Sequence, residues 1–272
     1  MRESRSFGVG KRPPTGRLSS SLVNMPNRPD AIFAVPRLAE IYDLLEGERV
    51  DLEPYLAMAA EFGARSALDV GCGTGTFACL LSERGVEVTG VDPAAASLDV
   101  ARAKPGAGRV RWLHGDATSL PELAADLATM TANVSHVFLT DQDWSAALRG
   151  IHAALHPGGR LVFEARNPGR QAWQNWNREG TFLRLDVPGL GEVQTWLDLT
   201  EVSGEYVSYR RTYVFAADGA TLTSDSTRRL RTRAELQDSL GAAGYTLTEV
   251  RDAPDRPGRE WVFIAAKPDG RP

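Results

Sequence analysis

The segment that most constrains this chain is a glycine-rich turn between a short apolar run and an expected helix. It reads Ala67-Leu-Asp-Val-Gly-Cys-Gly-Thr-Gly-Thr-Phe77. In an α/β sheet, such a unit brings bare backbone and unpaired N–H groups up to a nucleoside-like ligand. Its glycines alternate at Gly71, Gly73 and Gly75, whereas the dinucleotide fingerprint has its third glycine one position later. The spacing therefore favours a nucleoside without phosphates.

Composition limits the classes of protein that remain. The chain has 272 residues, a formal net charge of −4 and no apolar run of transmembrane length, so we expect a cytoplasmic protein without a membrane partner. A nucleic-acid partner is disfavoured, because neutralising phosphates requires a basic face. The two cysteines, Cys72 and Cys79, indicate neither a disulfide framework nor a metal site.

The first thirty residues differ from the rest. Arginine and lysine occur there among Ser, Gly and Pro, with few apolar residues. We predict a disordered basic tail over residues 1–30, because this composition buries too little apolar surface to fold. A transit peptide is the less favoured alternative. Met25 is a second possible start of the native protein, so residues 1–24 are left open.

The remaining pattern predicts one domain over residues 31–268. Helical spacing covers 31–45 and 52–62, and short apolar strands then alternate with helices. The expected strands are 67–70, 86–91, 110–113, 125–130 and 160–165, and the expected helices are 76–84, 94–103 and 144–155. Two final strands, 246–251 and 260–266, are joined too closely for a helical crossover and should be antiparallel. The fold class is α/β, a doubly wound, mostly parallel seven-stranded sheet with the last strand antiparallel.

An insertion interrupts this order at residues 180–231. Runs 193–202, 206–215 and 221–230 are rich in Thr, Val and Tyr and are separated by turn residues, which predicts an antiparallel β meander. Its expected roles are a lid over the site or the pairing of two subunits through an exposed strand edge.

Acidic residues end the first three strands. Asp69 precedes the glycine turn, Asp92 ends the second strand, and Asp116 follows the third. A carboxylate has two acceptor oxygens and suits a vicinal diol such as that of ribose. Each aspartate alone has a structural alternative, which for Asp92 is an N-cap of the next helix. Together the three point to a nucleoside site.

These motifs resemble those of class I S-adenosylmethionine-dependent methyltransferases, over about residues 31–268. A more specific resemblance is to small-molecule methyltransferases, including the deoxysugar amine methyltransferases of antibiotic pathways. Ile41-Tyr42-Asp43, the strands of 191–230 and the hairpin Asp255–Glu260 carry this likeness. The resemblance implies S-adenosylmethionine as cofactor, a small-molecule acceptor with an O or N nucleophile, and in-line methyl transfer. The cofactor-binding residues it implies are Asp69, Gly71, Cys72, Gly73, Gly75, Asp92, Pro93, Asp116, Ala117, Asn133 and, as a lid, Tyr42. The stretch from Met130 to Asn133 should touch the methionine part of the cofactor.

The sequence indicates less about where the methyl acceptor binds, and the catalytic residues stay unknown. Four candidates for a base are His114, His136, Glu164 and Tyr42, and the sequence does not choose among them. His136 and Asp141 are expected near the cleft entrance. Trp173, Trp176 and Trp196 would either line an acceptor pocket or pack between the meander and the sheet. The arginines of the insertion, Arg210, Arg211, Arg228, Arg229 and Arg231, are expected on a solvated face, with an acidic substrate as the alternative.

Other functions remain open at this point. A nicotinamide oxidoreductase is opposed by the glycine spacing, by Asp116 and by the reversed last strand. A non-catalytic relative that binds the cofactor is a second alternative. Methyl transfer to a protein or peptide is a third.

Overall fold

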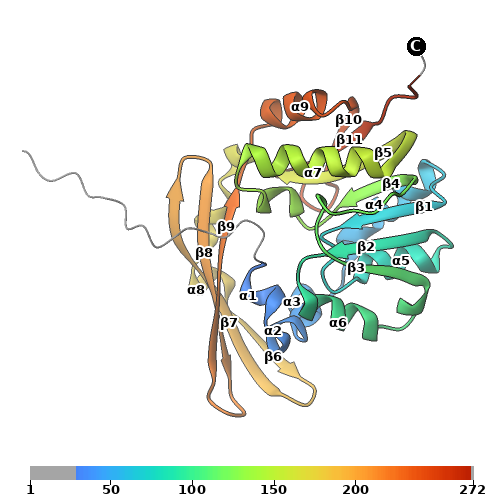
Figure 1. Cartoon of the computed structure of the whole chain (residues 1–272). Helices are drawn as coiled ribbons and strands as arrows, with labels where there is room; N and C mark the ends of the chain where they lie inside the picture. Colours follow the sequence, from blue (N-terminus) through green and yellow to red (C-terminus); the bar gives the residue numbers. More distant parts are fainter. Residues whose placement is uncertain (1–28, 271–272) are drawn as a thin grey trace, which may run out of the picture.

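The computed structural model describes residues 29–270 and contains two β-sheets with helices around and between them (Figure 1). The larger sheet has seven strands in the order β10-β11-β5-β4-β1-β2-β3. All its pairings are parallel except those of β11 with β5 and with β10. Its strands are β1 (Ser66–Val70), β2 (Glu87–Asp92), β3 (Val110–His114), β4 (Ala125–Met130), β5 (Leu155–Arg166), β10 (Thr246–Asp252) and β11 (Glu260–Ala266). The predicted fold class is confirmed, including the reversed final strand.

Helices cover both faces of this sheet and form its two cores. One core joins the sheet to α7 (Asp141–Ala154) and α9 (Arg233–Ala242), with Trp144 and Phe163 among its fully buried side chains. The opposite core joins it to α4 (Glu53–Glu61) and α5 (Thr76–Glu83). The central strands are buried on both faces, which explains their short, continuous apolar sequences. The helix α6 (Ala95–Ala103) follows β2.

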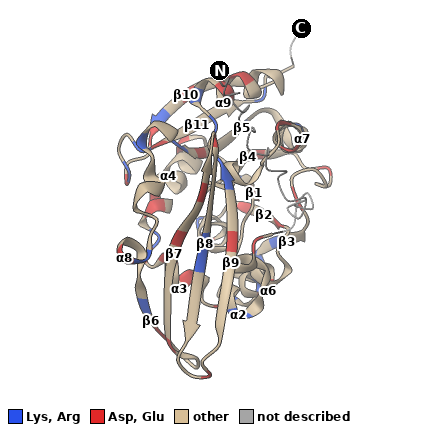
Figure 2. Ribbon diagram, turned by 90° about the vertical axis from the view of Figure 1, so that its left-hand side faces the viewer, with Lys and Arg blue, Asp and Glu red and all other residues tan. Residues whose placement is uncertain are grey.

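The second sheet is antiparallel and has the order β6-β7-β8-β9. Three of its strands match the predicted meander: β7 (Gly191–Ser203), β8 (Tyr206–Phe215) and β9 (Thr221–Arg229). The fourth, β6 (Leu183–Val187), was not predicted, because its Leu-Arg-Leu-Asp-Val sequence is too short to distinguish from a loop. Figure 2 faces this sheet, where Arg210 and Asp225 on neighbouring strands form an exposed ion pair of 2.6 Å.

The N-terminal helical region connects the two sheets. The single helix predicted over 31–45 is wrong: the structure has α1 (Ala31–Ala34), α2 (Pro36–Ala39) and α3 (Tyr42–Glu46). Pro36 explains the first break, because the residue before a proline avoids the helical region, and Val35 is extended at φ −88° and ψ 119°. Leu38 and Ile41 pack with Val193, Tyr213 and Phe215 of the second sheet in a third core.

Short 3-10 turns and one short helix complete the described part of the chain. The turns are η1 (Val50–Leu52), η2 (Ala107–Arg109), η3 (Val134–Val137), η4 (Pro168–Arg170) and η5 (Ala172–Asn175), and the helix is α8 (Arg178–Thr181) before β6.

Two further boundaries differ from expectation. The expected glycine break at Gly158–Gly159 falls inside β5, where the register against β4 shifts between Ala125 and Leu127. Of the predicted tail, 1–28 lies outside the described residues, whereas Asp30 binds Arg228 at 2.8 Å and belongs to the folded part. No helix in the range 29–270 is long and apolar enough to cross a membrane.

Candidate cofactor and acceptor site

A cavity of about 670 Å³ lies at the carboxyl ends of β1, β2 and β4 and extends to β9 of the second sheet. This position is where doubly wound sheets bind ligands, and the volume is typical of a small-molecule site. Most of the predicted cofactor residues line it. They are Tyr42, Asp69, Gly71, Cys72, Gly73, Asp92, Pro93, Asp116, Ala117 and Asn133. The topology therefore gathers residues that are far apart in the sequence into one space.

The glycine turn divides into residues that face the cavity and one that does not. Gly71, Gly73 and Gly75 all have positive φ, at 70°, 54° and 79°. A Cβ on Gly73 would meet nothing within 4 Å, and Gly73 lines the cavity. Gly75 lies outside the lining, and a Cβ there would approach Trp112 Cη2 at 2.4 Å and Ala101 Cβ at 2.8 Å. Gly75 is thus required by packing behind the turn, and its contact with the cofactor stays a prediction.

Asp92 links the second strand to this turn. Its Oδ2 accepts a hydrogen bond from the Gly73 N–H at 2.8 Å, and its Oδ1 accepts one from the Ala94 N–H at 2.8 Å. Burial raises the pKa of Asp92, and the two N–H donors oppose that shift. Since each carboxylate oxygen can accept more than one hydrogen bond, the carboxylate can still receive ligand hydroxyls. The local capping role and the diol-binding role are therefore compatible.

Asp69 is the most buried acid at the cavity. Its exposed fraction is 1% and its Oδ1 accepts a hydrogen bond from Thr129 Oγ1 at 3.0 Å. Burial raises the pKa of Asp69 to about 7, the charge of Asp92 adds to the rise, and the Thr129 hydrogen bond opposes it. A cationic ligand group would favour the ionised carboxylate.

Replacing Asp69 by asparagine should raise the thermal stability of the ligand-free protein at about pH 8, with no such gain near pH 4. Between an ordinary aspartate pKa of about 4 and the folded value, only the unfolded chain loses its proton, so stability falls as pH rises through this window. Asparagine removes that loss and keeps the acceptor for Thr129. Thermal denaturation across pH measures the effect, and an unchanged pH profile in the variant would contradict the raised pKa.

Asp126 provides a control, because its pKa is shifted in the opposite direction to that of Asp69. Burial raises the pKa of Asp126, but the N–H groups of Arg65 and Ser66 and the side chain of His156 outweigh it and lower the pKa to about 2. A carboxyl group whose pKa is lower in the folded than in the unfolded state stabilises the fold at pH values above the unfolded pKa. This stabilisation is lost as the pH falls toward the folded pKa. Asp126→Asn should therefore lower stability at neutral pH.

The third and fourth strands end in turns at the cavity. Asp116 Oδ1 accepts hydrogen bonds from the Thr118 N–H at 2.8 Å and from Thr118 Oγ1 at 2.6 Å. After β4, Ala132 and Asn133 have φ values of 54° and 62°, which are rare for residues other than glycine. The Asn133 N–H donates to Glu164 Oε1 at 2.8 Å and so holds this corner. Thr131, Ala132 and Asn133 line the cavity, whereas Met130, expected to touch the cofactor, is fully buried outside it.

Three of the four candidate bases lie outside the cavity lining. His114 contacts the Pro93 carbonyl at 3.0 Å, and the buried Glu164 is bound by Tyr55 Oη and by Asn133. His136 is buried and accepts the Arg166 N–H at 3.1 Å, and burial keeps its pKa well below the usual value.

Tyr42 lines the cavity, and its ring packs against Phe33 at 5.4 Å. Burial raises the pKa of Tyr42, so the phenol stays protonated at neutral pH and can donate a hydrogen bond.

The far end of the cavity combines apolar and charged residues. Phe33 of α1 and Thr227 and Arg228 of β9 form part of it, and the segment Val137–Thr140 with Gln142 and Asp143 forms another wall. Arg228 is paired with Asp30 at 2.8 Å. The expectation of a solvated arginine face holds for Arg210, but it is wrong for Arg228, Arg229 and Arg231, because their ion pairs lie between elements rather than on the open face.

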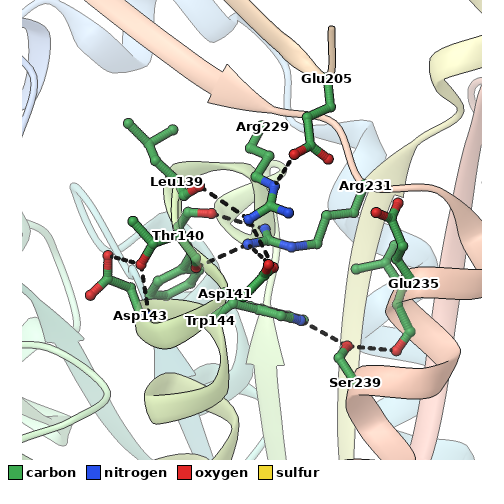
Figure 3. Close-up of polar contacts among 12 residues, drawn as sticks. Leu139, Thr140, Asp141, Asp143, Trp144, Glu205, Arg229, Arg231, Glu235 and Ser239 are labelled. Atoms are coloured by element: carbon green, nitrogen blue, oxygen red, sulfur yellow. Dashed lines mark hydrogen bonds and ion pairs between the residues drawn. The ribbon is translucent and has the colours of Figure 1, made fainter.

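Arg229 and Arg231 bind backbone carbonyl groups of the cavity-wall segment 138–140 (Figure 3). Arg231, 3% exposed, donates to the Phe138 and Thr140 carbonyls at 2.9 and 3.1 Å. Arg229 donates to the Leu139 carbonyl at 3.2 Å. Both guanidinium groups also pair with Asp141, at 2.8 Å from Arg229 and 3.5 Å from Arg231. Asp141, expected near the cleft entrance, lies outside the cavity lining. Its carboxylate instead pairs with the two arginines that hold the cavity wall.

The cavity lining does not include Trp173, Trp176 or Trp196. Trp176 packs edge-on against Tyr209 at 4.8 Å, and Trp196 stacks with Phe182 at 6.5 Å. Trp176 thus packs against the meander, and Trp196 packs within the insertion rather than between the meander and the large sheet.

Several lining residues carry no distinctive sequence signal. Arg49 faces the cavity and is held by a two-point contact with Asp51 at 2.9 Å. It stands in a mixed-charge segment after the Ile-Tyr-Asp motif, where nothing separates it from a surface arginine. Asp30 falls at the end of the predicted tail and Phe33 in the segment 31–45 with helical spacing, and Gln142 and Asp143 have only the pattern of an ordinary helix start.

The strand order, the reversed last strand and the glycine turn above a cavity define the class I methyltransferase fold. A family model described as "Methyltransferase domain" matches residues 67–159. Malonyl-[acyl-carrier protein] O-methyltransferase of Serratia marcescens is 31% identical over 196 residues, covering 69% of this chain and 70% of that protein. The chain therefore belongs to the S-adenosylmethionine-dependent methyltransferases.

Other relatives and solved structures agree with this assignment. Cypemycin N-terminal methyltransferase of a Streptomyces species is 31% identical over 133 residues, 47% of this chain, and the match spans 54% of that protein. The sugar N-methyltransferase KedS8 of Streptoalloteichus has a TM-score of 0.70 at 20% identity, covering 97% of this chain and 99% of that one. The CcbJ methyltransferase of Streptomyces caelestis has a TM-score of 0.69 at 22% identity, covering 87% and 97%. The KedS8 likeness covers nearly the whole chain and therefore includes most of the second sheet.

Proposed function

We propose that the glycine-turn end of the cavity holds S-adenosylmethionine and that the β9 end holds a small-molecule acceptor. The observation that carries the proposal is one continuous cavity between these two ends. In this arrangement Asp92 binds the ribose hydroxyls, Asp69 faces the cationic part, and Asp116 with Ala117 addresses the adenine. Gly71, Cys72, Gly73, Pro93 and Asn133 complete the contacts.

The residues present fit such a cofactor. Gly73 leaves open space where a Cβ would stand, and Arg49 brings a positive charge to the same cavity that Asp69 and Asp92 make negative. Zwitterionic ligands need both signs of charge. Bound there, S-adenosylmethionine would supply an activated methyl group on a sulfonium, which is already a good leaving group.

The protein's own contribution is positioning and exclusion of water. Tyr42 and Phe33 cover the cavity from the N-terminal helices, and the anchored wall Phe138–Thr140 faces the acceptor end. No base is assigned, because Tyr42 remains protonated and the two histidines and Glu164 lie outside the lining.

The volume of the cavity and the activities named for several relatives support a small-molecule acceptor with an O or N nucleophile. A peptide acceptor is the second candidate, because the cypemycin N-terminal methyltransferase is among the relatives. Incubation with methyl-labelled S-adenosylmethionine and separated fractions of a cell extract tests the choice. Label should enter the small-molecule fraction; label confined to proteins or peptides would overturn that part of the proposal.

We further propose a cytoplasmic location, no nucleic-acid partner, and a lid or subunit-pairing role for residues 180–231. The acidic net charge supports the absence of a nucleic-acid partner. Light scattering tests the pairing, which a monomeric mass would contradict.

A further inference from the structure

Asp43 reaches the glycine turn from outside the cavity. Its Oδ1 accepts a hydrogen bond from Thr74 Oγ1 at 2.6 Å and a longer one from Thr76 Oγ1 at 3.3 Å. Thr74 and Thr76 both line the cavity, but Asp43 does not. Any effect of Asp43 on a ligand must therefore act through the two threonines.

Lys104 completes this contact from a third element. Its Nζ lies 2.6 Å from Asp43 Oδ2 and donates to Thr76 Oγ1 at 2.6 Å. Asp43 belongs to α3, the threonines to the turn and the start of α5, and Lys104 immediately follows α6. These contacts join three segments that are far apart in the sequence, so one small polar cluster ties the N-terminal helices to the turn.

The turn needs such support because its own sequence provides little. Gly75 is the N-cap of α5 and has no side chain to accept a first-turn N–H group. Glycines alone leave the backbone with wide conformational freedom. A carboxylate near a helix N-terminus is also favoured by the helix dipole. Asp43 brings a negative charge to this helix start from a distant part of the chain, and it accepts hydrogen bonds from the hydroxyls of Thr74 and Thr76.

We infer that Asp43 is a positioning residue for the cofactor turn, acting through Thr74 and supported by Lys104. The inference rests on the proposed function of the cavity. Because Tyr42 precedes Asp43 on α3 and lines the cavity, the same contact sets the position of Tyr42 above the ligand.

The test is calorimetric titration of the full chain with S-adenosylhomocysteine. Asp43→Ala and Thr74→Val each remove the same hydrogen bond and should weaken binding by about fivefold to tenfold. The double variant should bind no more weakly than either single variant, because interacting partners are not additive. Thr74→Ser keeps the hydroxyl and should bind as the wild type does. Asp99→Ala on α6, which removes an exposed pair with Arg102, is the matched control.

The outcomes separate this inference from the function on which it rests. Wild-type binding with unchanged affinity in Asp43→Ala and Thr74→Val would overturn the positioning role and leave the cofactor site intact. Fully additive losses in the double variant would also overturn it. Absence of binding by the wild type would overturn both. Should Asp43→Ala fail to fold, Thr74→Val against Thr74→Ser decides the question alone.

Discussion

Replacing Asp92 by alanine is expected to weaken S-adenosylmethionine binding by at least about 100-fold, since two charge-assisted hydrogen bonds to a ligand diol are worth about 3 kcal/mol together. The same substitution removes the acceptor that holds the Gly73 N–H, so the turn loses its shape as well as its ligand contact. Isothermal titration calorimetry measures the affinity, and circular dichroism should show a retained fold.

Two further variants define what Asp92 contributes. Asp92→Asn keeps one side-chain acceptor for the turn and should give an intermediate affinity. Asp99→Ala removes an aspartate from the exposed surface of the following helix and should leave binding unchanged. An Asp92→Ala protein that binds the cofactor as tightly as the wild type would refute the assigned role.

The substitution Gly75→Ala should cost about 2 to 5 kcal/mol of unfolding free energy, the sum of overpacking and a left-handed backbone. The new methyl group would meet the Trp112 ring, which cannot swing away freely because its Nε1 donates to the Ala107 carbonyl at 3.1 Å. Urea denaturation of the ligand-free protein measures the loss.

Gly85 gives the matched control at the other end of α5. It has φ 85° and nothing within 4 Å of its Cβ position, so Gly85→Ala should cost only about 1 to 2 kcal/mol from the backbone. Trp112→Leu in the Gly75→Ala background should recover part of the loss. Equal losses at Gly75 and Gly85 would show that the Trp112 contact is unimportant.

The large sheet and the turn were predictable because local pattern and global fold agree there. Short apolar strands that alternate with helices indicate a parallel sheet whose carboxyl ends meet at one edge, and an acid stands at the end of each of the first three strands. Asp69, Asp92 and Asp116 converge for this reason alone. The reversed last strand followed from a connection too short for a crossover.

The acceptor end could not be predicted, because its residues come from elements that only tertiary packing brings together. Arg228 and Arg229 sit on an alternating strand whose sequence does not say which side is covered. The anchoring of Phe138–Thr140 by Arg229 and Arg231 depends on carbonyl groups, which every residue has. The break at Val35 was readable from Pro36, but the helical spacing of 31–45 concealed it.

The most direct test of the account is titration of the wild-type protein with S-adenosylmethionine, S-adenosylhomocysteine and NADH. The wild-type protein should bind both adenosyl compounds with micromolar affinity and should not bind NADH, and the Asp92→Ala protein should show no binding of any of the three. Binding of NADH without either adenosyl compound would contradict it, and so would binding of none of the three.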